Sequence, residues 1–207
     1  MARIISKYEK NTIILNVNAG RTIHGFDNAY RKKQIVSMGM SFLITDGLVF
    51  PNESRYDFME NFNLIVIGNS PNVLFSNSSL GINSLRDLKK ISLEKDLLYS
   101  TSGTFNHITL LELISSLSIK ARQIPYNGGA QSMLSVLSNQ AHFSMTNLTS
   151  IQTVYQNRNI RILGIDSEKR LKLYPEIPTL KEQMDYFPNA LAYAIIAIPK
   201  SMNKNDS

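Results

Sequence analysis

A run of hydroxyl-bearing residues around one glycine, Ser100-Thr101-Ser102-Gly103-Thr104, has the composition of an anion-binding loop. It follows an apolar, strand-like segment at 97–99 and precedes a helical pattern at 108–117. The first N–H groups of a helix have no partner within it, and the helix dipole is positive there, so this position favours a carboxylate or a phosphate. The alternative is an ordinary cap, in which a Ser or Thr side chain binds only its own helix.

Two further loops follow strand-like segments. The loop at 126–129 has two adjacent glycines, which permit a close backbone approach or a positive φ. No Gly-Lys-Ser/Thr follows, which excludes a Walker loop, and a tight turn is the simpler interpretation of this loop alone. The loop at 16–25 contains Gly20 and Arg21, without the G-x-G-x-x-G spacing of a dinucleotide site. Arg21 could pair with an anion or lie in an exposed turn.

Catalytic and metal-binding patterns are weak in this sequence. The three histidines, His24, His107 and His142, lack the spacing of a metal site, and the chain has no Cys, so neither a metal nor another cofactor is expected. A Ser hydrolase that uses Ser102 and His107 remains an alternative, but no G-x-S-x-G nucleophile elbow supports it. These patterns therefore do not predict an enzyme.

Composition limits the remaining classes. The 207 residues carry a net charge of +6, with 43% apolar and 18% charged residues, which excludes a disordered chain and allows one large or two small domains. Arg31-Lys32-Lys33 is the only basic triple, and the other basic residues are scattered, so a solvated surface explains the charge better than a nucleic-acid site, which remains an alternative. No apolar run approaches the roughly 18 residues of a membrane span, and residues 1–7 do not resemble a signal peptide.

The elements that would position these loops alternate between strand and helix, which predicts an α/β fold. Continuous apolar runs such as 64–67, 160–165 and 193–198 favour strands covered on both faces, as in parallel sheets. Two helices are predicted from apolar residues spaced i, i+3, i+4 and i+7. Their apolar positions are Leu110, Leu113, Ile114 and Leu117 in one, and Ala130, Met133, Leu134 and Leu137 in the other. Ser84 is predicted to cap a third helix, and Thr179 with Glu182 to form the capping box of a fourth.

Taken in order, these segments resemble the Bug/TctC family, the solute-binding receptors of tripartite tricarboxylate transporters. Residues 125–129 resemble its P-Y-x-G signature, and residues 99–107 resemble its ligand loop. The most specific match is 161–182, with Pro175-Glu176-Ile177-Pro178-Thr179 and Glu182. The resemblance covers about residues 1–200.

This resemblance implies a type II periplasmic-binding-protein fold, with two α/β lobes around a central cleft. Residues 77–189 would form lobe 2, and residues 1–76 plus 190–207 would form lobe 1. The implied ligand is a small carboxylate of the dicarboxylate or tricarboxylate class, held largely by backbone N–H groups and waters. The residues implied to contact it are Gly20, Thr101, Ser102, Gly103, Thr104, His107, Tyr126, Asn127, Gly128, Thr146 and Asn147. The implied protein is a periplasmic monomer that works with membrane transporter subunits, without nucleic acid.

Departures from the family pattern produce further expectations. Family members are longer, and the match predicts a first lobe that lacks its first strand and its last helices, as in a truncated receptor. His142 stands where the family has an acid, and Thr146-Asn147 where an Asp is common. The alternatives are a non-binding remnant of a receptor and a LysR-type effector-sensing domain, which shares the two-lobed fold. The absent signal peptide would place the chain in the cytoplasm if its start is real.

Overall fold

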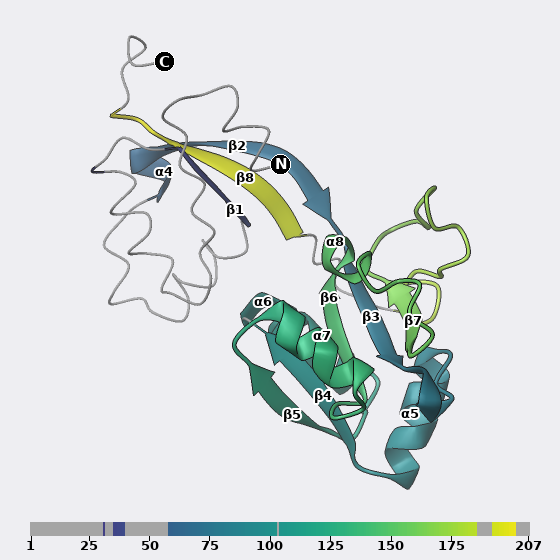
Figure 1. Ribbon diagram of the computed structural model, residues 1–207. Helices are drawn as coiled ribbons and strands as arrows, with labels where there is room; N and C mark the ends of the chain where they lie inside the picture. The colour runs from purple at the N-terminus through teal and green to yellow at the C-terminus, as the bar shows by residue number, and fades with distance from the viewer. Residues whose placement is uncertain (1–30, 32–34, 40–57, 103, 186–191, 202–207) are drawn as a thin grey trace. The chain divides into compact units, whose positions relative to one another are not determined.

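The computed structural model describes residues 31, 35–39, 58–102, 104–185 and 192–201 (Figure 1). These residues form a mixed α/β structure, which confirms the predicted fold class. The chain divides into two compact units. Unit 1 comprises Met1–Asn69 and Ala192–Ser207, and unit 2 comprises Ser70–Leu191.

Unit 1 contains a three-stranded sheet in the order β1-β8-β2. Its described elements are β1 (Val36–Gly39), α4 (Phe58–Asn61), β2 (Phe62–Ser70, whose last residue belongs to unit 2) and β8 (Ala192–Pro199). β1 and β8 are antiparallel, with Val36 opposite Ala197. The apolar run in β2 does not have both faces covered, because Ile65 and Val66 are 49% and 57% exposed. The expectation of a fully buried strand is therefore wrong for β2.

Unit 2 contains a five-stranded sheet in the order β5-β4-β6-β3-β7. Its strands are β3 (Asn72–Asn77), β4 (Leu97–Ser102), β5 (Ala121–Tyr126), β6 (Phe143–Asn147) and β7 (Ile160–Ile165). Its helices are η1 (Ser78–Leu80), α5 (Leu85–Glu94), α6 (Thr104–Ser116), α7 (Gly129–Leu137) and α8 (Leu148–Ile151). β4 pairs in parallel with β5 and β6, whereas β3 pairs antiparallel with β6 and β7. The expected parallel pairing thus holds for only one side of the sheet.

Two apolar clusters cover the faces of this sheet. Leu74 belongs to one cluster, with Leu110 and Leu113 of α6, and its neighbours Val73 and Phe75 belong to the other. Successive side chains of a strand point to opposite faces, so the clusters lie on opposite sides of β3. All six residues of β3 are buried, although the strand is antiparallel.

The predicted helical faces are confirmed for α6 and only in part for α7. The four apolar positions predicted for the first helix are buried or pack against the first cluster. In α7, Met133 and Leu137 pack against the second cluster, but Ala130 and Leu134 are exposed. The buried face of α7 consists of Ser132, Ser135 and Val136. The two serines can be buried there because their hydroxyl groups form hydrogen bonds within the protein.

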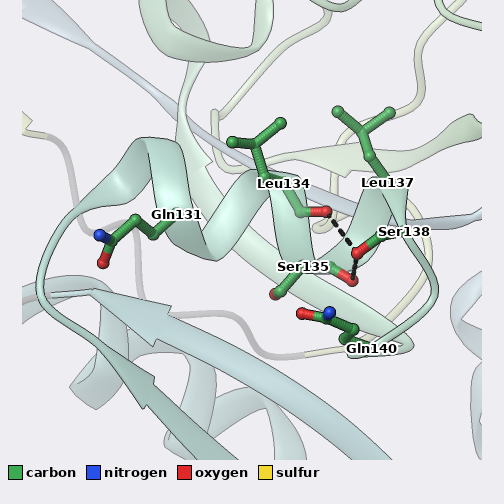
Figure 2. Close-up of a pocket in the computed structure, with 6 residues that line it drawn as sticks. All are labelled: Gln131, Leu134, Ser135, Leu137, Ser138 and Gln140. Carbon is green, nitrogen blue, oxygen red and sulfur yellow. Dashed lines mark hydrogen bonds between the residues drawn. The ribbon is translucent and has the colours of Figure 1, made fainter.

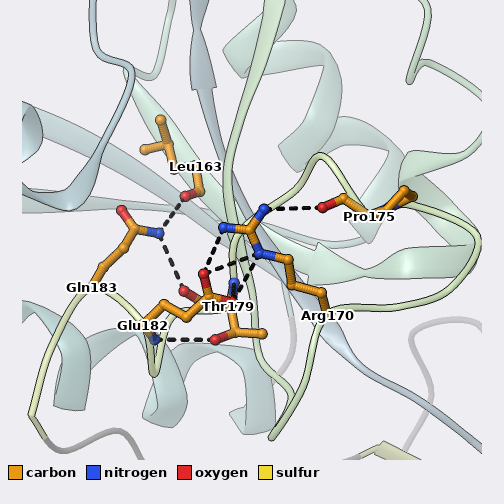
Figure 3. Close-up of polar contacts among 6 residues, drawn as sticks. All are labelled: Leu163, Arg170, Pro175, Thr179, Glu182 and Gln183. Carbon is orange, nitrogen blue, oxygen red and sulfur yellow. Dashed lines mark hydrogen bonds and ion pairs between the residues drawn. The ribbon is translucent and has the colours of Figure 1, made fainter.

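The predicted caps form, but one helix does not. Ser84 Oγ accepts a hydrogen bond from Asp87 N at 3.1 Å and caps α5. Glu182 N donates to Thr179 Oγ1 at 3.1 Å and Thr179 N donates to Glu182 Oε1 at 3.3 Å, as in a capping box. Residues 181–185 form a turn and a bend instead of the predicted helix. Gln183 Nε2 donates to Leu163 O at 2.8 Å, which binds this segment to β7 instead (Figure 3).

Arg170 holds the Glu182 carboxylate in a fork and also donates to Pro175 O (Figure 3). The hydrogen bonds that Arg170 donates to the carboxylate are the main reason why the pKa of Glu182 is lowered to about 2. A depressed carboxyl pKa stabilises the folded state above the unfolded-state pKa, and that stabilisation is lost as the pH falls through the folded-state value.

We expect Glu182→Gln to lower the urea midpoint at pH 7, and the difference from the parent chain to disappear as the pH falls from about 4.5 to about 2. Denaturation series at several pH values measure this. Arg170→Gln is the control, since Glu182→Gln should cost less in that background. A difference that does not change with pH would show that the ion pair contributes nothing.

Candidate functional site

Three strand ends meet at one edge of the unit 2 sheet. β4, β5 and β6 run in parallel and are followed by α6, α7 and α8 (Figure 1). β4 lies between the other two, and Ser102 is opposite Tyr126 in the register. The carboxyl ends of parallel strands are where α/β sheets commonly bind ligands, because helix N-termini gather there.

Gly129, the first residue of α7, faces two hydroxyl groups. A Cβ atom on Gly129 would lie 3.6 Å from Ser102 Oγ and 4.0 Å from Thr146 Oγ1. Thr146 is only 6% exposed. We call Ser102, Gly129 and Thr146 the hydroxyl cradle. These three residues carry no formal charge, so the cradle offers a ligand only hydroxyl groups and backbone.

The start of α7 leaves its own N–H groups available. Its N-cap is Gly128, which makes no side-chain hydrogen bond to the helix. The first intrahelical bond runs from Ser132 N to Gly128 O at 3.1 Å, so the N–H groups of residues 129–131 precede it. Such groups and the positive helix end attract an anion. The first turn of α7 therefore has no side-chain cap.

A second set of hydroxyls lies directly beneath the cradle. Ser100, Ser132 and Ser144, which we call the serine layer, are at most 3% exposed. Ser100 and Ser144 precede Ser102 and Thr146 by two positions and share their strand faces, and Ser132 follows Gly129 by one helical turn.

Hydrogen bonds within the serine layer connect α7 to β4 and β6. Ser100 Oγ donates to Ser132 O at 2.9 Å, and Ser132 Oγ donates to Ser100 Oγ at 2.9 Å. Ser144 Oγ donates to Ser100 O at 2.7 Å and lies 3.1 Å from Ser132 Oγ. The layer fixes the first turn of α7 against both strands, and it therefore positions the cradle.

Thr101 and His107 lie on the opposite face of β4 from the cradle. Thr101 is 4% exposed, and its Oγ1 accepts a hydrogen bond from Gln123 Nε2 at 2.8 Å. The same nitrogen lies 3.4 Å from His107 Nδ1, and the His107 ring packs 6.3 Å from the ring of Tyr99. Strand alternation therefore separates Thr101 from Ser102, although they are adjacent in sequence.

Burial lowers the pKa of His107, which favours the neutral imidazole. A neutral His offers a ligand no formal positive charge. Ser102 faces Gly129, whereas His107 packs with Tyr99 on the other side of β4. The structure thus does not bring together the Ser102–His107 pair that a hydrolase would need.

The other predicted ligand residues have mixed placements. Asn147 caps α8, because its Oδ1 accepts from Ser150 N at 3.2 Å and from Ser150 Oγ at 2.6 Å. Tyr126 is partly exposed and Asn127 exposed. Of the two possibilities stated for the glycine pair, a positive φ does not occur, since Gly81 is the described glycine with φ above zero. Gly20, Gly103 and the Thr104 side chain lie outside the described residues.

His142 has a structural role in place of an acid. Its Nδ1 accepts a hydrogen bond from Leu98 N at 2.7 Å, and its backbone N donates to Leu98 O at 2.8 Å. Burial lowers the pKa of His142, with a smaller contribution from nearby Lys95. The neutral ring therefore completes the pairing of β4 with β6 without a charge, whereas a carboxylate would bring one into this partly buried position.

Two surface pockets lie away from the cradle. One of about 460 Å³ is lined by Gln131, Leu134, Ser135, Leu137, Ser138 and Gln140 (Figure 2). Another of about 760 Å³ lies between the end of α6 and residues 181–185. Neither is lined by a cradle residue. The described residues contain no group of three acidic or His side chains that could hold a metal, and no helix among them is long and apolar enough to cross a membrane.

Comparison with known families shows to which protein family the chain belongs. Residues 35–204 match the model of the tripartite tricarboxylate transporter family receptor, TctC. The chain belongs to this family. Membership in the TctC family confirms the Bug/TctC resemblance and favours the receptor over the LysR-type domain.

Solved structures similar to this chain share its fold. Rpa4515 of R. palustris, solved with adipate, is 18% identical with a TM-score of 0.75, over 90% of this chain and 66% of that one. The periplasmic binding protein BugD is 18% identical with a TM-score of 0.71, over 90% and 65%. MatC from Rhodopseudomonas palustris, with bound malate, is 14% identical with a TM-score of 0.69, over 84% and 60%. These similarities confirm the predicted periplasmic-binding-protein-like fold.

A curated relative matches a shorter stretch. The UPF0065 protein in the gbd 5'region of Cupriavidus necator is 30% identical over 88 residues, which are 42% of this chain and 27% of that protein. The chain thus spans less than two thirds of the length of Rpa4515, BugD, MatC and the Cupriavidus protein.

Proposed function

We propose that this chain binds a small dicarboxylate in the periplasm, as the receptor component of a tripartite tricarboxylate transporter. The observation that carries the proposal is the hydroxyl cradle in front of the uncapped start of α7. Two hydroxyls and a turn of free N–H groups can donate several hydrogen bonds to one carboxylate without a buried cation.

Related structures support this ligand class. Rpa4515 was solved with adipate and MatC with malate, and both ligands carry two carboxylates. We propose that units 1 and 2 correspond to the two lobes, with the boundary at residues 69 and 70 instead of 76 and 77. In this proposal, the cradle holds one carboxylate on unit 2.

Isothermal titration calorimetry of the whole chain with adipate, malate and citrate tests the proposal. We expect saturable binding of at least one diacid and none of adipamide, the uncharged analogue of adipate. Binding of adipamide as tight as that of adipate would contradict carboxylate recognition. A folded sample that binds none of the acids would contradict the receptor function of this chain.

A further inference from the structure

Asn127 and Gly128 form an exposed Asn–Gly step immediately before α7. The Asn127 side chain is exposed, and a Cβ atom on Gly128 would meet nothing within 4 Å. Within the described residues, no hydrogen bond engages the Asn127 side chain or the Gly128 N–H. The carboxamide carbon and the following backbone nitrogen are thus free to approach each other, and glycine presents no side chain to hinder them.

We propose that Asn127 is a site of spontaneous deamidation that weakens the anion site at the start of α7. The Gly128 nitrogen attacks Asn127 Cγ, and a ring C–N bond forms. The side-chain amide leaves as ammonia, which carries away the proton of the Gly128 N–H. One water molecule then opens the succinimide ring to aspartate or isoaspartate. The net reaction consumes one water, releases one ammonia and involves no oxidant or reductant.

Neighbouring asparagines lack this combination of features. Asn139, Asn147 and Asn157 precede Gln140, Leu148 and Arg158, whose side chains hinder the attack. Asn147 Oδ1 is held by Ser150, and Asn157 Oδ1 accepts a hydrogen bond from Asn159 N at 2.9 Å. Asn127 and these three asparagines all lie between Arg122 and Arg158, so a single tryptic peptide contains all four.

The consequence for binding rests on the proposed function. Deamidation adds a carboxylate beside N–H groups that no side chain caps. An anion on the protein is stabilised there by the helix dipole, so it competes with a bound carboxylate and repels it. The modified chain should therefore remain folded and bind diacids less tightly.

Ageing of the purified chain at mildly alkaline pH, followed by tryptic peptide mass spectrometry, tests the reaction without any ligand. We expect Asn127 to convert to a mixture of aspartate and isoaspartate while Asn139, Asn147 and Asn157 persist. Gly128→Ala should slow the conversion without backbone strain, because its φ of −162° suits any residue. Conversion of Asn127 no faster than that of the other three would overturn the proposal.

Titration of Asn127→Asp with adipate and malate tests the consequence. We expect affinity about two- to fivefold lower than that of the parent chain, from the charge at the helix start. Asn139→Asp is the matched control, since it adds the same charge beyond the other end of α7, which is about 14 Å long, and should leave affinity unchanged. Equal affinities for both variants and the parent would overturn the proposed weakening of the anion site. A parent chain that binds neither acid would contradict the proposed function, while the mass-spectrometric result would still decide the modification.

Discussion

Gly129→Ala is expected to remove most of the carboxylate affinity while leaving the chain folded. The new methyl group would lie 3.6 Å from Ser102 Oγ and 4.0 Å from Thr146 Oγ1, which are ordinary contact distances. It therefore fills the hydroxyl cradle without a clash and displaces the ligand. The loss of hydrogen bonds to one carboxylate costs about 1–3 kcal/mol, or about 5- to 150-fold in Kd.

Calorimetry with adipate and malate measures this loss, and circular dichroism checks the fold. Gly68→Ala is the matched control, because it makes the same change in β2 at a position where a Cβ atom meets nothing within 4 Å. Unchanged affinity in the Gly129→Ala chain would show that the cradle does not hold the ligand.

Ser132→Val is expected to cause the largest loss of stability among these substitutions. Ser132 is 3% exposed and hydrogen bonds with both Ser100 and Ser144. The added bulk costs about 1–3 kcal/mol, and the loss of the buried hydroxyl costs about 1–3 kcal/mol more. A total of about 2–6 kcal/mol is a large fraction of the stability of a typical domain.

Ser132→Thr separates the two contributions, because threonine and valine have nearly the same shape and threonine keeps the hydroxyl. We expect the Thr variant to be about 1–3 kcal/mol more stable than the Val variant in chemical denaturation. Equal stabilities would show that the serine layer contributes through its small size alone. Such a result would also remove the argument that its hydrogen bonds position the cradle.

The sequence predicted the elements of unit 2 well because their signals are local. Apolar spacing placed α6, and Ser84 marked the start of α5. The capping box of Thr179 and Glu182 is also local, and it forms. The helix expected after it does not form, because contacts distant in sequence determine the conformation of residues 181–185. Arg170 binds Glu182, and Leu163 O of β7 accepts a hydrogen bond from Gln183, and no local pattern contains these contacts.

The candidate site was only partly predictable for a similar reason. Ser102 and Thr146 were singled out, but their partner Gly129 becomes evident only when the parallel register of β4 with its neighbours is known. Alternation along β4 separates Thr101 from Ser102, which a contiguous motif cannot show. The serine layer was missed because Ser100, Ser132 and Ser144 are far apart in sequence. Each resembles an ordinary polar position until its burial is known.

The pairing of β1 with β8 imposes an order on folding during synthesis. β8 is the central strand of its sheet, and it is made after all of unit 2. β1 and β2 therefore leave the ribosome long before the strand that joins them exists, whereas unit 2 is one continuous segment that can fold earlier. Closing the unit 1 sheet requires contacts between residues as distant as Val36 and Ala197, so it is the slow, late step. Until then, β2 lacks the strand that pairs with it, and an unpaired strand with apolar residues is prone to aggregation.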